Sequence, residues 1–145
     1  MKLDQLEKLI SSYRDFPEKG IVFRDVLEIL QEPAIFNKLI KNMSNVDFLL
    51  ESDAIISIDA RGFIFGSAIS LYTSKPIIFA RKPGKLPGEL VSKSYNLEYG
   101  DNSLSIQKKF LDKYNSFAIV DDLLATGGTV NCVYEIINEF EKKVS

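Results

Sequence analysis

Short runs dominated by apolar residues recur along the chain and are separated by polar loops. The runs at 54–58, 76–80 and 117–120 are typical of buried parallel strands. The first and third lead through glycine-containing loops into predicted helices at 63–73 and 130–140, the latter with apolar residues at helical spacing. Strands that alternate with helices favour an α/β fold with a central, mostly parallel sheet flanked by helices.

The N-terminal part of the chain has a different pattern. Apolar residues within 2–13 recur on one face and predict an amphipathic helix that packs on the body of the protein or on a partner subunit. Pro17 and Gly20 end this helix, and residues 21–25 form a short predicted strand. Pro33 is suited to the first turn of a second helix.

Residues 89–106 are polar, with apolar side chains at alternating positions. This pattern predicts a two-stranded antiparallel flap that turns at Gly100-Asp101-Asn102. A flap of this kind can close over a site.

The loop after the third apolar run carries two acidic residues, two threonines and two glycines, in the order Asp121-Asp-Leu-Leu-Ala-Thr-Gly-Gly-Thr129. Its backbone N–H groups can converge at the positive end of the following helix, which is a seat for a phosphate. No lysine lies in the loop, whereas loops that hold nucleoside triphosphates carry one, so we expect a monophosphate. Taken singly, the aspartates or the glycines would fit an acidic helix cap or a turn without any ligand.

Asp121 and Asp122 lie at the carboxyl end of the predicted strand, where open α/β sheets bind ligands. Their carboxylates can accept hydrogen bonds from a sugar diol, or bind Mg²⁺ through water. A phosphate on one side and vicinal hydroxyls on the other are typical of a ribose 5-phosphate.

The other two strands also end in loops that carry cations. Arg61 follows the first strand, and three cations lie within 81–88 after the second. Taken alone, Arg61 would most often form a surface ion pair, the segment 81–88 would be a solvated loop, and Arg24 would pair with Asp25 at the surface. In an acidic chain, however, 81–88 is the densest basic segment, and it leaves the same sheet edge as the other two loops.

Composition excludes several classes of chemistry. The chain has 145 residues, a length typical of one domain, and 18 Lys+Arg against 20 Asp+Glu, which argues against non-specific binding of nucleic acid. It has no histidine, so imidazole acid/base chemistry and His-dependent zinc sites are excluded. Its single cysteine, Cys132, excludes an internal disulfide and is expected to be a small, buried or half-buried helix residue. No apolar run reaches the length of a membrane span, and the expected location is cytoplasmic.

Residues 120–129, Val-Asp-Asp-Leu-Leu-Ala-Thr-Gly-Gly-Thr, resemble the phosphoribosyl-pyrophosphate (PRPP) motif of type I phosphoribosyltransferases, and the Leu-Leu-Ala variant resembles that of the adenine phosphoribosyltransferases. The likeness extends over nearly the whole chain from Phe16. It implies one type I phosphoribosyltransferase domain over 1–145, with a small hood at about 14–32, a flexible flap at about 82–107 and the PRPP motif at 117–129.

The resemblance implies transfer of the 5-phosphoribosyl group from PRPP to adenine, giving AMP and pyrophosphate. Mg²⁺ would be held through PRPP and water, without direct protein ligands. A homodimer is also implied, with the first helix as part of the contact. Two alternatives remain: a non-catalytic sensor of PRPP or nucleotide on the same fold, and a phosphoribosyltransferase for another purine. Glu98 and the basic segment favour the enzyme.

The resemblance also implies roles for individual residues. In the hood, the backbone at Val22 reads the adenine edge, Phe23 stacks on the ring, Arg24 contacts the base or closes the site, and Leu123 covers the other face of the base. The 5-phosphate binds Ala125, Thr126, Gly127, Gly128 and Thr129, and the ribose binds Asp121 and Asp122.

Pyrophosphate binds the often-cis peptide of Asp59 and Ala60 together with Arg61, Arg81, Lys82 and Lys85. In the flap, Glu98 is the catalytic acid/base and Tyr99 is a further site residue.

The end of the chain differs from the family pattern. Ser145 lies in or just after the helix that follows the phosphate loop, whereas family members continue through another strand. The expected sheet therefore lacks an edge strand, and part of the wall of the base site is missing.

Overall fold

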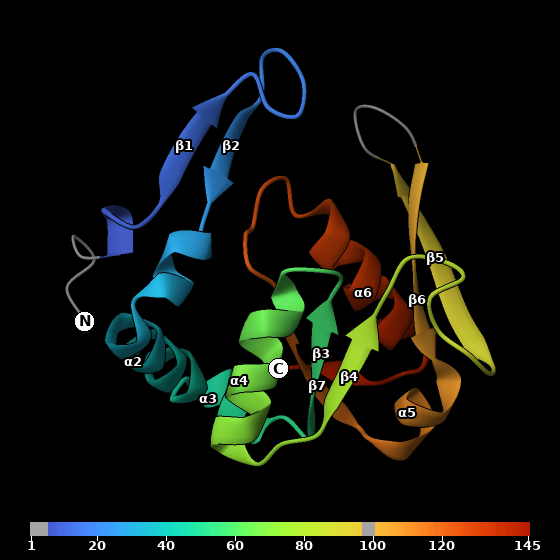
Figure 1. Cartoon of the computed structure of the whole chain (residues 1–145). Helices are drawn as coiled ribbons and strands as arrows, with labels where there is room; N and C mark the ends of the chain where they lie inside the picture. The colour runs from blue at the N-terminus through green and yellow to red at the C-terminus, as the bar shows by residue number, and fades with distance from the viewer. Residues whose placement is uncertain (1–5, 97–100) are drawn as a thin grey trace. The chain divides into compact units, whose positions relative to one another are not determined.

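The computed structural model describes residues 6–96 and 101–145, which divide into two compact units. The first unit extends to Met43 and the second begins at Ser44. Figure 1 labels most of the helices and strands of both.

The first unit is a hairpin followed by helices. Strand β1 (Ser11–Arg14) pairs antiparallel with β2 (Val22–Asp25), and the 3₁₀ helix η1 (Leu27–Gln31) and helix α2 (Pro33–Ser44) follow. The predicted strand at 21–25 and the predicted helix at Pro33 are confirmed.

The predicted helix over 2–13 is wrong over its last residues. Only Leu6 and Glu7 are helical among the described residues of that segment, and Ser11–Arg14 is a strand. Two serines there are weak helix formers, and pairing with β2 satisfies the backbone instead. Tyr13 is 51% exposed, so it does not extend a buried helical face.

The second unit is built on a four-stranded parallel sheet with the strand order β4-β3-β7-β8. The predicted strands are confirmed as β3 (Ala54–Ile58), β4 (Ile77–Ala80) and β7 (Ser116–Val120), and the predicted helices as α4 (Gly62–Thr73) and α6 (Gly128–Glu139). Two further short helices are α3 (Asp47–Glu51) and α5 (Lys108–Lys113).

The sheet also has an edge strand that the sequence pattern did not predict. Helix α6 ends at Glu139, and β8 (Lys143–Val144) then pairs with Ser116 and Phe117 at the start of β7. The expectation that this edge strand is missing was therefore wrong for these two residues.

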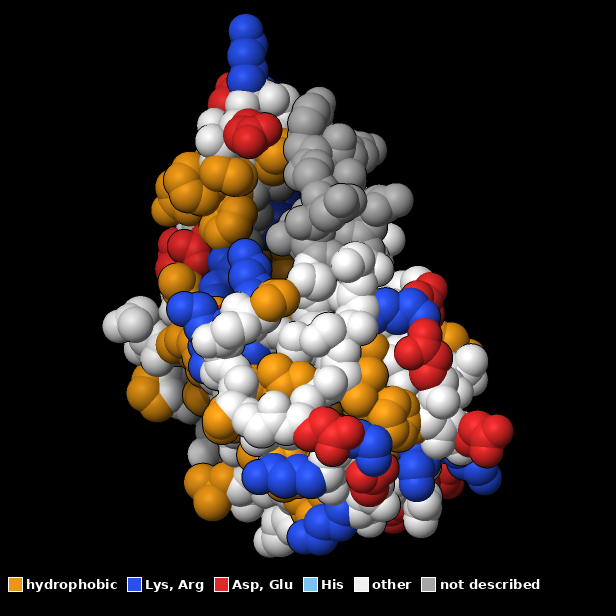
Figure 2. Space-filling model, turned by 90° about the vertical axis from the view of Figure 1, so that its right-hand side faces the viewer, with side chains coloured by type: hydrophobic (Ala, Val, Ile, Leu, Met, Phe, Trp, Pro, Cys, Tyr) orange, Lys and Arg blue, Asp and Glu red, His pale blue; other side chains and the backbone are white. Residues whose placement is uncertain are grey.

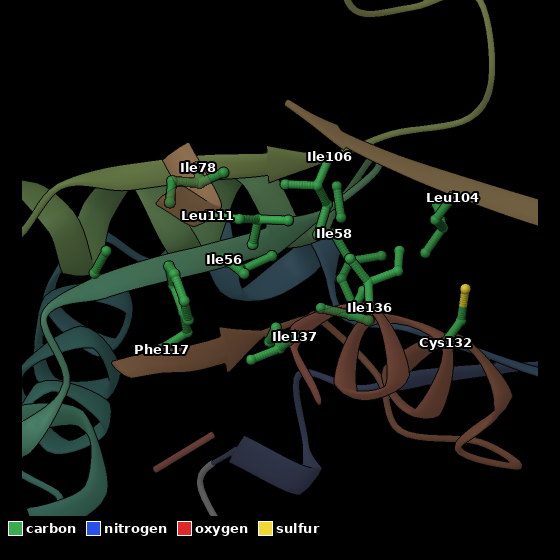
Figure 3. Close-up of a cluster of buried hydrophobic side chains, with 13 residues drawn as sticks. Ile56, Ile58, Ile78, Leu104, Ile106, Leu111, Phe117, Cys132, Ile136 and Ile137 are labelled. Atoms are coloured by element: carbon green, nitrogen blue, oxygen red, sulfur yellow. The ribbon is translucent and has the colours of Figure 1, made fainter. Parts of the chain in front are cut away.

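Every residue of β3 is buried, so both faces of the sheet must be covered. Ser57 packs against Gly66 of α4 on one face. On the other, Ile56 and Ile58 join a core built with α6 and the base of the β5–β6 hairpin (Figure 3). Cys132 is 1% exposed in this core, as predicted.

The predicted antiparallel flap is confirmed as β5 (Leu90–Asn96) paired with β6 (Asp101–Gln107). The predicted turn at 100–102 was wrong in part, because residues 101 and 102 are already in β6 and pair with residues 96 and 95. The intervening 97–100 lie outside the described residues. Leu104 and Ile106 are buried, so the base of the hairpin belongs to the core.

Asp53 fixes the register between β3 and β7. Its Oδ2 accepts hydrogen bonds from the backbone N–H groups of Asn115 and Ser116, each at 3.0 Å, and its own N–H donates to the Ser116 carbonyl at 3.0 Å. The carboxyl ends of the two strands are therefore aligned, and the loops that follow them start side by side.

No helix in the described part of the chain is long and apolar enough to cross a membrane.

Candidate active site

The loop between β7 and α6 forms a pocket at the N-terminus of α6. Gly127 is the N-cap, with φ +82°, a conformation that favours glycine, and its carbonyl accepts the N–H of Asn131 at 2.8 Å. A Cβ at Gly127 would lie 4.0 Å from Leu124 Cδ1, so backbone conformation rather than protein crowding calls for glycine. The cavity has a volume of about 140 Å³ and is lined by Asp121, Leu123, Leu124, Ala125, Thr126, Gly127, Thr129 and Val130.

This pocket is suited to a phosphate. Helix α6 has 12 residues, and the partial positive charge of its N-terminus faces the loop. Thr126 and Thr129, both hydroxyl-bearing residues, line the same cavity.

Asp121 is half-buried beside this pocket. Its Oδ1 accepts the N–H of Asp122 at 2.9 Å. The pKa of Asp121 is raised to about 6, chiefly by burial and also by the neighbouring Asp122 carboxylate, while the hydrogen bond from the Asp122 N–H and the charge of Arg61 oppose the shift. A Cβ at Gly62 would lie only 2.9 Å from Asp121 Oδ1, so the start of α4 can approach this carboxyl because residue 62 is glycine.

Two ion pairs join the three loops at the carboxyl edge of the sheet. Arg61 Nε lies 2.8 Å from Asp122 Oδ2, and this carboxylate side chain is only 9% exposed. The pair links the loop after β3 to the loop after β7.

The second ion pair links the loop after β4 to the loop after β3. Arg81 Nε donates to Asp59 Oδ2 at 2.9 Å, and the guanidinium carbon lies 5.4 Å from the centre of the Phe63 ring. The peptide bond between Asp59 and Ala60 is cis, as the family resemblance implied.

The rest of the basic segment is open to solvent. Lys82 and Lys85 are exposed. Elsewhere on the surface, the face drawn in Figure 2 has Lys and Arg side chains interspersed with Asp and Glu, in keeping with the net charge of −2.

The hood residues lie in the first unit. Val22 is 53% exposed, and Phe23 packs edge to face on Phe16 with ring centres 5.1 Å apart. A cavity of about 190 Å³ there is lined by Tyr13, Phe16, Phe23 and Asp25. An aromatic wall of this kind is suited to a planar ring.

The surface pair expected for Arg24 is replaced by other contacts. Arg24 donates to Ser12 Oγ across the hairpin, and Asp25 Oδ1 accepts the N–H of Leu27 at 2.9 Å. Each side chain is satisfied within its own local structure, so the two do not need to pair.

Comparison with known proteins identifies the family. The family described as "Phosphoribosyl transferase domain" matches residues 25–144. An adenine phosphoribosyltransferase of Prochlorococcus marinus (strain MIT 9312) is 66% identical over 142 residues, which cover 98% of this chain and 84% of the relative. The chain belongs to the adenine phosphoribosyltransferase family.

Solved structures of adenine phosphoribosyltransferases have the same fold. The enzyme of Thermoanaerobacter pseudethanolicus matches with a TM-score of 0.88 at 37% identity, over 99% of this chain and 83% of that one. The Saccharomyces cerevisiae enzyme, complexed with adenine and D-2,5-dideoxy-2,5-imino-altritol 1,6-bisphosphate, matches with a TM-score of 0.82 at 32% identity, over 97% and 82% of the two chains. The predicted type I phosphoribosyltransferase fold is confirmed.

The structure brings together most of the residues to which the family resemblance gives a role. Asp59, Arg61, Arg81 and the segment 121–129 meet at one edge of the sheet. Glu98 and Tyr99 lie outside the described residues. The ligand roles of all these residues remain predictions.

Sequence reasoning missed the partners of the two arginines. It treated Arg61 and Arg81 as ligands of an anion, whereas each also joins a carboxylate of a neighbouring loop. Gly62, directly after Arg61, was an available signal, because a glycine at the start of a helix often marks a close approach of backbone or side chain.

The described residues hold no group of three or more His, Cys, Asp or Glu side chains placed to bind a metal ion. Asp122 is engaged by Arg61, while Asp121 lines the phosphate pocket. This donor set fits a metal that keeps its water shell.

Proposed function

We propose that this chain transfers the 5-phosphoribosyl group of PRPP to adenine, giving AMP and pyrophosphate. The observation that carries the proposal is the convergence of the pocket at the N-terminus of α6 with two arginine-bearing loops at one sheet edge. Membership of the adenine phosphoribosyltransferase family supports the choice of purine.

In this proposal the 5-phosphate binds the N-terminus of α6 at residues 125–129. The ribose hydroxyls then donate to Asp121 and Asp122, which lie between this pocket and Arg61. Hydrogen bonds to carboxylates are stronger than those between neutral groups, so the two aspartates fix the sugar.

The pyrophosphate leaves towards Arg61, Arg81, Lys82 and Lys85, with the Asp59–Ala60 peptide beside it. Two of these cations are held in place by carboxylates, while the lysines are free to reach from an exposed loop. Cations fixed before the reaction stabilise the charge that develops on the leaving group, because they need no reorganisation.

Mg²⁺ completes the proposed site, and Asp121 and Asp122 would hold it through water and PRPP oxygens. When bound, the ion neutralises negative charge on the pyrophosphate. The aspartates themselves orient the ribose and the water around the ion.

Adenine is the proposed nucleophile, held by Val22, Phe23 and Arg24 of the hood and by Leu123, which is 37% exposed. The aromatic wall of the hood supports this role, since a neutral purine needs an apolar face. We propose that the hood (about 14–32), the flap (about 82–107) and the PRPP motif (117–129) form a single domain.

The decisive experiment is a purine comparison on the full chain. With PRPP and Mg²⁺, chromatography should detect AMP from adenine and little nucleotide from guanine or hypoxanthine. Preferential formation of GMP or IMP would overturn the choice of base. PRPP binding without nucleotide formation from any purine would favour a non-catalytic sensor.

Glu98 is the proposed acid/base that exchanges a proton with the purine ring, with Tyr99 beside it in the flap. Glu98→Gln should lower kcat by about 10²–10⁴-fold and leave PRPP affinity nearly unchanged, because the carboxyl acts on the base rather than on the phosphates. Glu89→Gln, at an exposed position before β5, is the matched control. Full turnover by Glu98→Gln would remove this residue from the mechanism.

We also propose a homodimer in the cytoplasm, as the family resemblance implies. Light scattering coupled to gel filtration measures the mass directly. A mass of one 16.4 kDa chain at working concentration would contradict the dimer.

A further inference from the structure

Helix α6 does more than present its N-terminus to the phosphate pocket. Its outer face holds the β5–β6 hairpin through Lys93, whose Nζ lies 3.2 Å from Glu135 Oε2 and also pairs with Glu139 Oε1. Hydrogen bonds to Glu139 and Glu135 raise the pKa of Lys93 above its usual 10.5, because they stabilise its charged form.

The backbone of Lys93 also makes a partly buried contact with α6. Cys132 Sγ donates to the backbone carbonyl of Lys93 at 3.3 Å. Leu104, which pairs with Lys93 in the hairpin ladder, is 2% exposed and faces Cys132 in the core (Figure 3). The hairpin is therefore seated on α6 at one defined position along both of its strands.

The far side of the same hairpin holds the end of β4. Ser105 and Arg81 exchange both of their backbone hydrogen bonds, at 3.0 and 2.7 Å. The side chain of Arg81 in turn binds Asp59. A continuous series of contacts thus runs from α6, through Lys93 and β6, to the loops proposed for pyrophosphate.

We propose that Lys93 is a positioning residue that seats the hairpin on α6 and thereby sets the spacing between the 5-phosphate pocket and Arg81. The inference rests on the proposed function, because PRPP carries a phosphate group at each end. A ligand that occupies two binding sites at once gains affinity only when the spacing of the sites matches the length of the ligand. A ligand that occupies one site is insensitive to that spacing.

The test compares two-ended and one-ended ligands on the full chain by titration calorimetry with Mg²⁺. Lys93→Met keeps the aliphatic stem and removes the charge. Since exposed ion pairs are individually weak, it should weaken PRPP binding by about three- to fivefold. Binding of ribose 5-phosphate and of pyrophosphate, each measured alone, should change less than about twofold. Lys93→Arg should restore PRPP binding.

Lys108→Met is the matched control. Lys108 pairs with Asp112 at 2.6 Å and is 35% exposed, close to the 30% of Lys93, but its ion pair lies within α5. The proposal would be overturned if Lys93→Met weakened the binding of all three ligands equally, or if it left the affinity for PRPP unchanged. It would also be overturned if Lys108→Met lost as much affinity for PRPP as Lys93→Met.

Hydrogen exchange separates this proposal from the proposed function. Lys93→Met should speed amide exchange in 90–96 and 103–107, and Lys108→Met should not. If the wild-type chain binds PRPP but makes no AMP, the proposed function fails while the comparison of ligands still stands. Unchanged exchange in the hairpin would contradict the role of Lys93 whatever the activity.

Discussion

Arg61 and Arg81 show how a single side chain can serve both structure and chemistry. Each guanidinium uses its Nε for a carboxylate of a neighbouring loop, and Arg81 Nη1 also donates to the Lys85 carbonyl at 3.5 Å. A guanidinium has five N–H donors, so an ion pair through Nε does not use up its capacity to bind an anion. Both arginine side chains are about one-third exposed, while the carboxylate side chains they bind are 9% and 14% exposed, so each ion pair is partly shielded from solvent. Their main effect is to hold the cations in place.

Asp121 predicts a pH dependence of PRPP binding. Its carboxyl, with a pKa of about 6, accepts hydrogen bonds from hydroxyls best when ionised. Affinity for PRPP should therefore fall as the pH falls from 8 to 5. Calorimetry at each pH measures it, and Asp121→Asn, which cannot titrate, corrects for protonation of the phosphates. A pH profile identical in wild type and Asp121→Asn would contradict the role of this carboxyl.

The same raised pKa has a consequence for stability, of opposite sign to that of most acidic groups. The folded state binds the proton more tightly than the unfolded state, whose Asp pKa is 3.8. The contribution of Asp121 to stability is therefore greatest below pH 3.8 and decreases as the pH rises towards about 6.

At Gly66 even the addition of a single methyl group should lower the stability of the fold. A Cβ there would overlap with Ser57 Oγ and lie 2.6 Å from Ser57 Cβ, where helix α4 packs on the centre of the sheet. Gly66→Ala should lower the free energy of unfolding by about 1–3 kcal/mol, measured by chemical denaturation.

A double variant tests the stated cause. Ser57→Gly removes the clashing side chain, so Gly66→Ala should cost much less in that background. Ser57 Oγ is buried without a hydrogen-bond partner among the described residues, so Ser57→Ala alone should cost little. Equal costs of Gly66→Ala in both backgrounds would contradict the clash.

Among the elements, the parallel pairing of β3 with β7 determines where the loops meet. Asp53 holds that pairing at the end opposite the site, with two backbone N–H groups on one carboxylate oxygen. A slip of two residues would move one loop by about 6.6 Å relative to the other. The alignment of the site therefore depends on a residue far from it.

Asp53 predicts an acid-sensitive fold. Hydrogen bonds from Asn115 and Ser116 hold its pKa below 3.8, so its contribution to stability is present above that pH and is lost as the pH falls through the lowered value. Asp53→Asn should unfold more easily than wild type at pH 6, with the difference disappearing towards pH 2. Thermal unfolding between pH 2 and 6 measures it. A constant difference over this range would contradict the role of the charge.

The elements that the sequence predicted correctly are those whose own residues show a clear pattern, independent of the rest of the fold. The runs at β3, β4 and β7 are long and apolar enough to be recognised, and α4 and α6 follow glycine-containing loops. By contrast β1 was taken for helix, because only its pairing with β2 makes it a strand. The short helices α3 and α5 and the two-residue strand β8 carry too few residues for a periodic pattern and are not continuous apolar runs.

The candidate site likewise has features that the sequence alone revealed and features that depend on the fold. The segment 121–129 was recognisable because its residues are consecutive. The pairs Arg61–Asp122 and Arg81–Asp59 were not, because each joins residues far apart in the sequence whose approach depends on the fold. The same holds for Lys93 with Glu139.

For the molecule as a whole, the described residues proposed to bind phosphate and ribose lie at one sheet edge of the second unit. The hood provides an aromatic wall in the first unit. The proposed reaction needs both, because one holds PRPP and the other holds the base. The purine comparison on the full chain is therefore the experiment that tests the molecule rather than its parts.

The place of β3 at the centre of the sheet has a consequence for biosynthesis. Every residue of Ala54–Ile58 is buried, and on one side this strand pairs with residues that emerge from the ribosome 63 positions later. At usual translation speeds, that side of β3 stays open for roughly 3–13 s on the nascent chain. During this interval a strand that is fully buried in the folded sheet is open on that side to chaperones and to incorrect partners.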